Sequence, residues 1–394
     1  MVYSILDTDF YKFTTSYAYM KMFPDAIGTF EYFDRNNTSY TLNEIEQLKT
    51  IIFDFCENTK LSNNEFNYCS KTLTRYIPQF YWEWLSNFKF NFDRIKISSE
   101  KNNDGKYKLH ISVTDKLYKC TLYEVPLLSI ISEWMNPGND KITLWKDVLI
   151  KLKYKIEISK NSFKFADFGT RRRYSYIVQD FVVGYLSKYT DNFVGTSNVY
   201  LAMKYKVTPI GTHPHEWFMF HGAQYGYKSA NYMALENWVN VYDGDLGTAL
   251  ADTYTSDSFL NNFSRKQAKL FDGVRCDSGD EYNFVDRLIA RYQELGVDPS
   301  TKTIIFSNAL DFKKALSIYT YCQGKIRCSF GIGTNLTNDT GYSPSNIVMK
   351  LSRCKMNNHQ EWRECVKLSD DLGKHMGSMS EVEACLHELR LNEA

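Results

Sequence analysis

The sequence predicts an α/β protein in which a parallel sheet or barrel follows an α+β domain. In the second half, short apolar stretches alternate with polar loops and amphipathic helical stretches. Their spacing of about 25–30 residues is typical of βα units. The first half instead holds long aromatic-rich helical stretches and a strand pair. A chain of 394 residues has room for two domains of roughly 100–200 residues each.

The first half predicts the elements of the α+β domain. Helices are expected over residues 42–57 and 64–88, which are rich in aromatic side chains. Residues 94–118 alternate as short strands. The Asn-Asn-Asp-Gly run at 102–105 lies between these strands and is a good hairpin signal.

The second half predicts the βα units. Apolar positions from Tyr174 to Val182 fall at helical spacing within residues 171–188, and Gly296 ends a helix expected over 281–295. Ligands of such folds meet the loops after the strand C-termini, so a site is expected there. The expected strands cover residues 163–166, 207–210, 273–276, 303–306 and 326–330, and a further helix covers 311–321.

Composition excludes several classes of protein. The formal net charge is +1, so no general affinity for nucleic acid or anionic membrane is expected. No apolar run approaches the roughly 18 residues of a membrane span, and Asp7, Asp9 and Lys12 interrupt the stretch that a signal peptide would need. The nine cysteines include no Cys-x-x-Cys pair, which argues against a zinc ribbon. We expect a soluble, reduced, cytoplasmic protein.

Three arginines follow the strand at 163–166, at positions 171–173 of the segment Asp-Phe-Gly-Thr-Arg-Arg-Arg. They fall in the expected first turn of a helix, where the macrodipole disfavours cations by about 0.3–1 kcal/mol per charge. An anionic ligand would remove this conflict, because guanidinium groups bind phosphate in bidentate fashion. A solvated basic patch with salt bridges is the alternative.

Two histidines, His213 and His215, follow the strand at 207–210. In an extended segment they would share one face. Together with His221 they could bind a metal ion. Alternatively, one imidazole could attack a phosphoryl group while Glu216 or another carboxylate orients it. Two purely structural histidines are the third possibility.

The segment after the strand at 273–276 carries a second set of polar side chains. Asp277 stands at the strand end, where a carboxylate suits ribose hydroxyls or Mg²⁺. Arg275 lies on the same strand face. Capping of the following helix would explain Ser278 and Asp280, but it explains Asp277 less well.

Two further polar loops follow the last expected strands. Ser307 and Asn308 follow residues 303–306, and Gly331, Gly333 and Thr334 end the strand at 326–330. Glycines free backbone N–H groups to approach an oxyanion, and a threonine adds a hydroxyl donor. A tight turn would also explain the glycines. Taken together, the five loops predict a site for a phosphorylated sugar.

The motifs, taken in chain order, resemble those of the nicotinate phosphoribosyltransferase family. The members of this family are pyridine-salvage enzymes of the type II phosphoribosyltransferases. The resemblance runs to about residue 375. It implies an irregular α/β barrel over residues 135–350 and an α+β domain formed by residues 1–134 with 351–394. The matching motifs begin at Leu6, Glu124, Asp167, Val194, Gly211, Arg275, Phe306, Phe330 and Lys367.

The resemblance also implies an activity. Nicotinate and phosphoribosyl pyrophosphate would give nicotinate mononucleotide and pyrophosphate, the first step of NAD salvage. ATP hydrolysis would be coupled to this reaction through a phosphohistidine, with Mg²⁺ as cofactor and ATP as co-substrate. The family resemblance further implies a homodimer with a shared active site.

Roles for individual residues follow from the same resemblance. His215 matches the histidine that ATP phosphorylates, Asp277 matches the carboxylate that holds the ribose hydroxyls, and Arg275 matches an arginine of the catalytic site. Phe168 and Tyr11 match the aromatic pair around the pyridine ring, with Tyr11 expected from the other subunit. The implied substrate-binding residues are Tyr11, Phe168, Thr170, Arg171, Ser197, Ser307, Asn308, Gly331, Gly333 and Thr334.

Ser197 bears on the choice of base. It stands where similar nicotinamide enzymes carry an aspartate, which would accept from an amide but repel the nicotinate carboxylate. A serine can donate to an acid, so nicotinate is favoured. The alternatives are a nicotinamide-using phosphoribosyltransferase, a metal-dependent barrel hydrolase that uses the His-x-His pair, and a binding protein without turnover.

Overall fold

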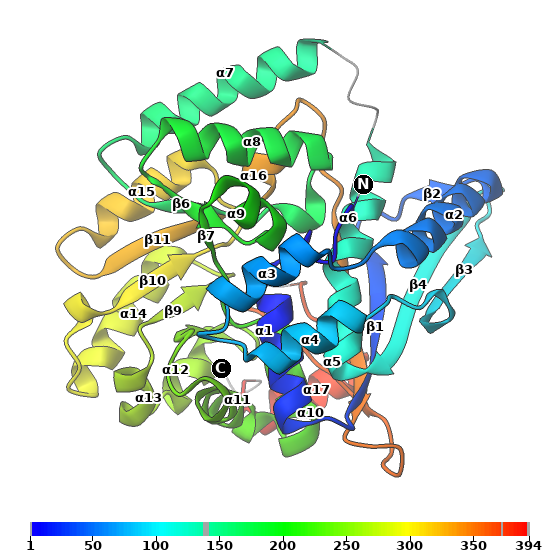
Figure 1. The fold of residues 1–394 in the computed structure, drawn as a ribbon. Coiled ribbons are helices and arrows are strands. Elements are labelled where there is room, and N and C mark those ends of the chain that lie inside the picture. The colour runs from blue at the N-terminus through cyan, green and yellow to red at the C-terminus, as the bar shows by residue number, and fades with distance from the viewer. Residues whose placement is uncertain (1, 137–141, 372, 392–394) are drawn as a thin grey trace.

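The computed structural model describes residues 2–136, 142–371 and 373–391, and Figure 1 shows its fold. A parallel sheet and an antiparallel sheet lie on either side of helix α1 (Phe10–Met22). The α/β class predicted from the sequence is therefore confirmed. In these described ranges, no helix has both the length and the apolar character to cross a membrane.

The parallel sheet has seven strands in the order β7-β6-β5-β11-β10-β9-β8. Every neighbouring pair is parallel, so all strand C-termini meet at one edge. The sheet curls into the irregular barrel that the resemblance implied. Two of its strands, β6 and β8, were not expected from the sequence. The bounds are β5 (Phe165–Asp167), β6 (Phe193–Thr196), β7 (Thr208–Pro209), β8 (Thr248–Leu250), β9 (Gly273–Cys276), β10 (Thr303–Phe306) and β11 (Arg327–Ile332).

Helices cover the parallel sheet. In Figure 1, α7 and α8 lie at the top, and α13 and α14 lie at the lower left. Buried strand residues such as Ile304 and Phe306, both 0% exposed, form the core beneath the helices. The bounds are α7 (Ile142–Ser159), α8 (Tyr176–Tyr189), α9 (Val199–Tyr205), α10 (His215–Tyr225), α11 (Tyr227–Tyr242), α12 (Ser256–Asn262), α13 (Arg265–Leu270), α14 (Glu281–Glu294), α15 (Phe312–Cys322) and α16 (Thr334–Thr337).

The antiparallel sheet joins the two ends of the chain. Strand β12 from the C-terminal segment pairs with β1 along its length, which confirms that both ends build the α+β part. The hairpin expected at 102–105 is present, with Gly105 N donating to Asn102 O at 3.1 Å. The exact domain boundaries stay a prediction. The bounds are β1 (Ile27–Asp34), β2 (Ser39–Tyr40), β3 (Ile95–Lys101), β4 (Tyr107–Lys116), β12 (Ile347–Lys355) and β13 (Arg363–Glu364).

The remaining helices flank the antiparallel sheet and its connections. The helix expected over residues 42–57 is confirmed as α2, and its N-cap Thr41 forms a capping box with Glu44. The expected helix at 64–88 is instead two helices, because the chain turns before Pro78, the N-cap of the second. The bounds are α2 (Leu42–Asn58), α3 (Asn63–Thr72), α4 (Gln79–Asn87), α5 (Leu117–Cys120), α6 (Glu124–Met135) and α17 (Met379–Glu388), with short 3₁₀ turns at Phe92–Arg94, Thr121–Tyr123, Thr170–Arg172 and Pro299–Thr301.

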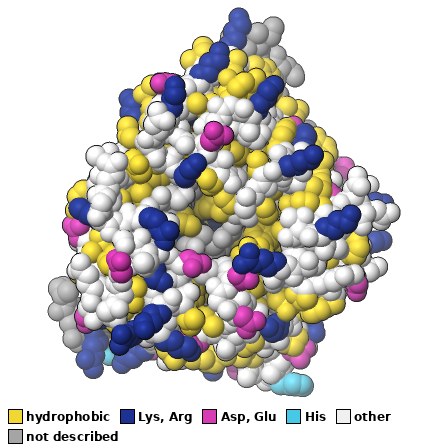
Figure 2. All heavy atoms as spheres, turned by 60° about the vertical axis from the view of Figure 1, so that its left-hand side comes forward, with side chains coloured by type: hydrophobic (Ala, Val, Ile, Leu, Met, Phe, Trp, Pro, Cys, Tyr) yellow, Lys and Arg dark blue, Asp and Glu magenta, His cyan; other side chains and the backbone are white. Residues whose placement is uncertain are grey.

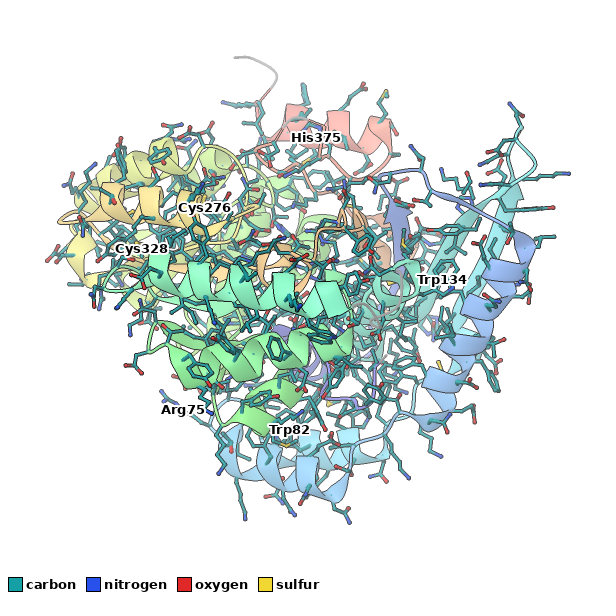
Figure 3. The ribbon with its side chains drawn as sticks, turned by 90° about the horizontal axis from the view of Figure 1, so that it is seen from above. Arg75, Trp82, Trp134, Cys276, Cys328 and His375 are labelled. Atoms are coloured by element: carbon teal, nitrogen blue, oxygen red, sulfur yellow. The ribbon has the colours of Figure 1, made fainter. Side chains whose placement is uncertain are left out.

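Two further views place these parts in space. Seen from above, Cys276 of β9 and Cys328 of β11 lie in the parallel-sheet part, and Trp134 of α6 lies toward the antiparallel sheet (Figure 3). Basic and acidic side chains are interspersed over the face shown in Figure 2, in keeping with a net charge of +1.

A buried ion pair holds the N-terminal segment on the parallel sheet. Arg173 donates to both oxygens of Asp7, at 2.6 and 2.9 Å, and both side chains are 0% exposed. Helix α8 begins only at Tyr176, with Ser175 as its N-cap. The expectation that the three arginines occupy a first helical turn is therefore wrong, because Arg173 is drawn into extended backbone to reach Asp7.

Replacing Asp7 by Asn should lower the free energy of unfolding by about 3–5 kcal/mol, because the buried Arg173 would lose its bidentate carboxylate partner. Urea unfolding of the full chain would measure the change. The control is Glu46→Gln, which breaks an exposed pair with Lys49 and should cost less than about 1 kcal/mol. Equal effects of the two substitutions would contradict the role given to the buried pair.

Candidate active site

The loops after the parallel strands bring the predicted site residues to one edge of the sheet. Phe168 follows β5, Ser197 follows β6, Asp277 follows β9, Ser307 follows β10, and Gly333 follows β11. Since neighbouring strands are parallel, these side chains come together although they are far apart in sequence. The edge is therefore the candidate active site.

His215 lies at this edge, beside the loops after β8 and β9, as the first residue of α10 after the N-cap Pro214. Its Nδ1 lies 3.0 Å from Thr253 Oγ1, and its Nε2 lies 3.1 Å from Asp277 Oδ2. Burial, together with the nearby charge of Lys367, lowers the pKa of His215 to about 4. The imidazole is therefore neutral at neutral pH and has a lone pair on one nitrogen.

Arg275 organises the polar groups beside His215. Its guanidinium donates to Asp277 Oδ1 at 2.7 Å, to Ser307 Oγ at 2.7 Å and to Thr212 Oγ1 at 2.9 Å. Burial acts to raise the pKa of Asp277, but Arg275 and His215 hold it well below its ordinary value. Asp277 is consequently an ionised carboxylate with a fixed orientation.

Asp252 is a site residue that the sequence did not reveal. It follows the three-residue strand β8 and is 0% exposed. Ser278 donates to its Oδ2 at 2.5 Å, while its Oδ1 lies 3.8 Å from His215 Nε2 and has no hydrogen-bond partner among the described residues. Ligand atoms of His215, Asp252 and Asp277 lie within 4.8 Å of one another, close enough to hold a metal ion.

His213 does not take part in this cluster. Its ring is 0% exposed and packs edge-on against Trp238 at 4.3 Å between centroids. Neither ring nitrogen has a hydrogen-bond partner within the described chain, and burial lowers its pKa to about 3. His221 is likewise enclosed, with Nδ1 2.6 Å from Trp217 O. The interpretation of the histidines as a shared metal site is therefore wrong.

Phe168 and Tyr11 reach the site from different elements of one chain. The Arg275 guanidinium lies 5.9 Å from the Phe168 ring. A Cβ added to Gly331 would lie 2.3 Å from that ring, so Gly331 makes room for the aromatic side chain. The Tyr11 backbone abuts Gly211, and Arg171 interacts electrostatically with the phenol. That a second subunit supplies the Tyr11 ring to this site stays a prediction.

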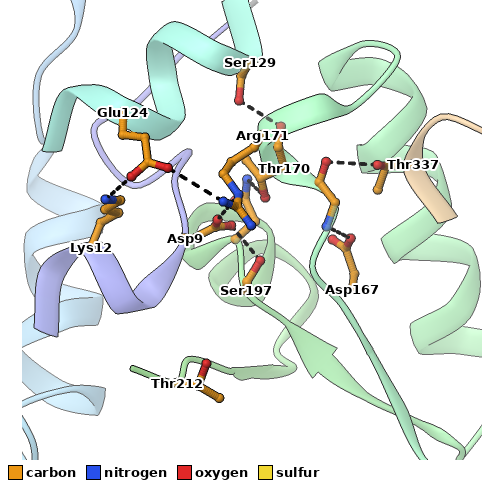
Figure 4. A network of polar contacts seen from close by, with 12 residues as sticks. Asp9, Lys12, Glu124, Ser129, Asp167, Thr170, Arg171, Ser197, Thr212 and Thr337 are labelled. Atoms are coloured by element: carbon orange, nitrogen blue, oxygen red, sulfur yellow. Dashed lines mark hydrogen bonds and ion pairs between the residues drawn. The ribbon is translucent and has the colours of Figure 1, made fainter. Parts of the chain in front are cut away.

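Arg171 lies between two carboxylates in the network that Figure 4 shows. Its Nε is 3.8 Å from Asp9 Oδ2, and its Nη1 is 3.7 Å from Glu124 Oε1. Ser197 Oγ donates to Asp9 Oδ1 at 2.6 Å, so its hydroxyl hydrogen is already engaged. In this structure the hydroxyl is directed at Asp9, and direct donation to an acid stays a prediction.

The structure also shows the surroundings of three further predicted substrate-binding residues, Thr170, Asn308 and Thr334. Thr170 is 0% exposed and accepts from Gln179 at 3.0 Å, so its hydroxyl is turned into the interior. The Asn308 amide reaches Gly279 O at 3.5 Å, beside the site. Thr334, the first residue of α16, is half-buried next to Gly333.

Three further basic side chains, Arg172, Lys350 and Lys367, line the same region. Burial, and then the charge of Arg171, lowers the pKa of Arg172 to about 10. Burial lowers the pKa of Lys350 to about 7. Lys367 Nζ lies 3.1 Å from His215 Nε2. Lys350 was not identified from the sequence, because it lies in strand β12 of the antiparallel sheet and not in a loop after a parallel strand. A cluster of this kind favours a ligand with several negative charges.

Two family models and several known proteins match this chain. A model of the "Nicotinate phosphoribosyltransferase (NAPRTase) family" matches residues 163–392, and a model of the corresponding N-terminal domain matches residues 6–132. A nicotinate phosphoribosyltransferase of Chromohalobacter salexigens is 42% identical over 100% of this chain and 99% of its own length. One from Desulforapulum autotrophicum is 39% identical over 99% of both chains.

Solved structures agree with the sequence relatives. The crystal structure of a nicotinate phosphoribosyltransferase from Porphyromonas gingivalis matches with a TM-score of 0.94 and 44% identity, covering 99% of this chain and 100% of that one. The structure of a putative nicotinate phosphoribosyltransferase from Saccharomyces cerevisiae matches with a TM-score of 0.87 and 31% identity, covering 98% of both chains. The similarity extends over both sheets.

The buried histidines predict how stability depends on pH. His213 stays neutral in the folded chain down to about pH 3, but in the unfolded chain it gains a proton below about pH 6.5. Since the unfolded state binds more protons in this window, stability should fall as the pH drops from about 6.5 toward 3. His213→Phe should reduce the slope near pH 5 by about 1.4 kcal/mol per pH unit. Urea unfolding at several pH values measures it, and an unchanged slope would contradict the buried neutral ring.

Proposed function

The chain belongs to the nicotinate phosphoribosyltransferase family, and from this premise we propose that it joins nicotinate to phosphoribosyl pyrophosphate. The products are nicotinate mononucleotide and pyrophosphate, in the first step of NAD salvage. The observation that carries the proposal is the convergence of Phe168, Arg275 and Asp277 with cationic side chains at one sheet edge. Phe168 suits an aromatic base, Asp277 suits the ribose hydroxyls, and Arg275 and the other cationic side chains suit the phosphates.

The transfer reaction requires that the base be oriented and that the charge on the leaving group be stabilised. The pyridine nitrogen is already nucleophilic, and a ring held against Phe168 would aim it at the anomeric carbon, an effect worth several kcal/mol in general. Pyrophosphate leaves as a polyanion that the Arg172 guanidinium could receive, and a nearby anion would favour the charged form of Lys350, whose pKa burial lowers to about 7. The ionised Asp277 would hold the ribose hydroxyls while the sugar becomes cation-like.

We propose Mg²⁺ as the cofactor. Carboxylate oxygens are the ligands that it prefers, and Asp252 Oδ1 has no hydrogen-bond partner among the described residues, so Asp252 and Asp277 fit as the holders. When bound, Mg²⁺ would neutralise charge on the phosphates. Lys367 lies close to both carboxylates and would compete with the ion for them.

We further propose that ATP is a co-substrate and that His215 accepts its phosphoryl group. Three features support this role: the ring is neutral, it is fixed on both nitrogens, and it lies among Asp252, Asp277 and Lys367. A neutral imidazole has the lone pair that phosphoryl transfer needs. Release of that phosphoryl group would couple ATP hydrolysis to synthesis.

The assembly and location of the enzyme rest on the family resemblance and on composition, and a cytoplasmic homodimer stays a prediction. We propose that the active site is shared in this homodimer, with Tyr11 supplied by the other subunit. Activity per chain should then fall at concentrations below that at which the chain associates.

Replacing His215 by Ala should abolish ATP stimulation and leave at most a slow, ATP-independent transfer, because no imidazole remains to take the phosphoryl group. Mononucleotide formation from phosphoribosyl pyrophosphate and Mg²⁺, with nicotinate or nicotinamide and with or without ATP, measures this. His359→Ala, on the exposed surface, is the control and should behave as wild type.

The outcomes of that assay separate the alternatives. Product from nicotinate with ADP released supports the full proposal. Product from nicotinamide alone would support the other phosphoribosyltransferase. Binding of phosphoribosyl pyrophosphate without product would point to a binding protein, and ATP stimulation that survives in His215→Ala would overturn the assignment of His215.

Replacing Ser197 by Asp should raise the KM for nicotinate at least about tenfold, or about 1.4 kcal/mol, and shift preference toward nicotinamide. A second carboxylate would lie beside Asp9, which Ser197 now contacts at 2.6 Å, and would repel an anionic base. Ser197→Ala is the matched control, since it removes the hydrogen bond without adding charge. An unchanged ratio of the two bases in Ser197→Asp would remove Ser197 from the account of selectivity.

A further inference from the structure

Ser278 follows Asp277 in the loop after β9 and is only 2% exposed. Capping of the next helix was the explanation that the sequence offered, but α14 is capped by Asp280, whose side chain accepts from Asn283 N. The Ser278 hydroxyl instead donates to Asp252 Oδ2 at 2.5 Å. A contact of this length is typical of a hydroxyl that donates to an ionised carboxylate. Ser278 therefore joins the loop after β9 to the loop after β8.

The C-terminal segment fixes the direction of this hydroxyl. Asp370 N donates to Ser278 Oγ at 3.1 Å, which occupies a lone pair of the oxygen and leaves its hydrogen for Asp252. Asp370 is held in turn by the start of α12, because its Oδ1 accepts from Ser256 N at 2.7 Å. A Cβ added to Gly279 would lie 2.9 Å from Asp370 Cβ, so the glycine allows the segment to approach this closely. Ser278 therefore accepts on one side and donates on the other.

The two carboxylates of the candidate cation site are held in the same way. Arg275 donates to Asp277 Oδ1 at 2.7 Å, as Ser278 donates to Asp252 Oδ2. The second oxygen of each carboxylate lies near His215 Nε2, at 3.1 Å for Asp277 Oδ2 and 3.8 Å for Asp252 Oδ1. Asp252 Oδ1 has no hydrogen-bond partner among the described residues. Both second oxygens therefore lie on the side where these carboxylates and His215 could hold one ion.

We propose that Ser278 is a positioning residue that aims Asp252 Oδ1 at a divalent cation. The inference rests on the proposed function, in which Asp252 and Asp277 hold Mg²⁺. A carboxylate without a second contact turns about its Cβ–Cγ bond, whereas the bond from Ser278 restrains this rotation and keeps the other oxygen on the cation side. Loss of a hydrogen-bonding partner of this kind typically costs about 10–100-fold in metal affinity.

Lys367 is the competitor that makes this restraint necessary. It lies close enough to Asp252 for their charges to interact, and an ammonium binds carboxylate oxygens as a cation does. Without the bond from Ser278, the Asp252 carboxylate would be free to turn toward Lys367 and would offer the metal ion a weaker contact. Ser278 therefore favours the metal ion over the lysine.

The experiment measures binding of Mn²⁺ alone to the full chain, from the loss of the EPR signal of the free ion. In Ser278→Ala the Kd for Mn²⁺ should rise at least about tenfold. In an Asp252→Ala background the same substitution should change the Kd by less than about twofold, because Ser278 acts through that carboxylate. Ser278→Thr keeps a hydroxyl and should recover most of the affinity. Ser159→Ala, which removes a buried hydroxyl that donates to Ile156 O at 3.1 Å, is the matched control and should bind as wild type does.

Mononucleotide formation at varied Mg²⁺ separates positioning from a role in the fold alone. Ser278→Ala should need about tenfold more Mg²⁺ for half-maximal rate, and excess Mg²⁺ should restore the maximal rate. A maximal rate that stays low at any Mg²⁺ concentration, with unchanged Mn²⁺ affinity, would overturn the inference.

The Mn²⁺ titrations also separate this inference from the proposed function. An unchanged Kd in Ser278→Ala beside a weakened Kd in Asp252→Ala would overturn the role of Ser278 and leave the cation site standing. Equal Kd values in wild type and Asp252→Ala, or no binding by wild type, would instead overturn Asp252 as a holder of the cation, and the role of Ser278 with it.

Discussion

The contact between Asp7 and Arg173 fixes the N-terminal segment against the parallel sheet, and the site is assembled around it. The pair is bidentate and fully buried, so its geometry is strict and its loss leaves an uncompensated charge. Phe10 N donates to Ser197 O at 2.7 Å nearby. Because residues 9–12 follow directly, this docking decides where their side chains enter the sheet edge.

The position of the N-terminal segment also places a series of alternating acidic and basic side chains in the interior. Lys12 is 0% exposed and contacts both Glu124 and Glu216, and Glu124 in turn lies 3.7 Å from Arg171. Each buried ion is costly alone, and opposite neighbours lower that cost. Since Lys12 satisfies the two glutamates at short range, Arg171 keeps only long contacts and 32% exposure, and it remains available to an anion.

The local sequence pattern was enough to predict some helices and strands but not others. Strands β9 and β10 were predicted correctly at residues 273–276 and 303–306, and β10 contains an apolar run that a loop follows. Strands β6 and β8 have four and three residues, too few to show a period. The start of α8 was predicted too early, because Arg173 pairs with Asp7, which lies 166 positions away in the sequence. The spacing of residues in the sequence contains no information about so distant a partner. Asp252 was not identified from the sequence for the same reason.

The two neighbouring histidines show how burial and contact divide one motif into different roles. The short segment before α10 turns His213 toward Trp238 and His215 toward Asp277. Burial lowers the pKa of both rings, so burial alone does not distinguish them. What distinguishes them is hydrogen bonding: His213 has no hydrogen-bond partner within the described chain, whereas His215 is held at both nitrogens. Desolvation keeps the His215 lone pair at neutral pH despite two adjacent carboxylates, and the surrounding contacts give that lone pair a direction.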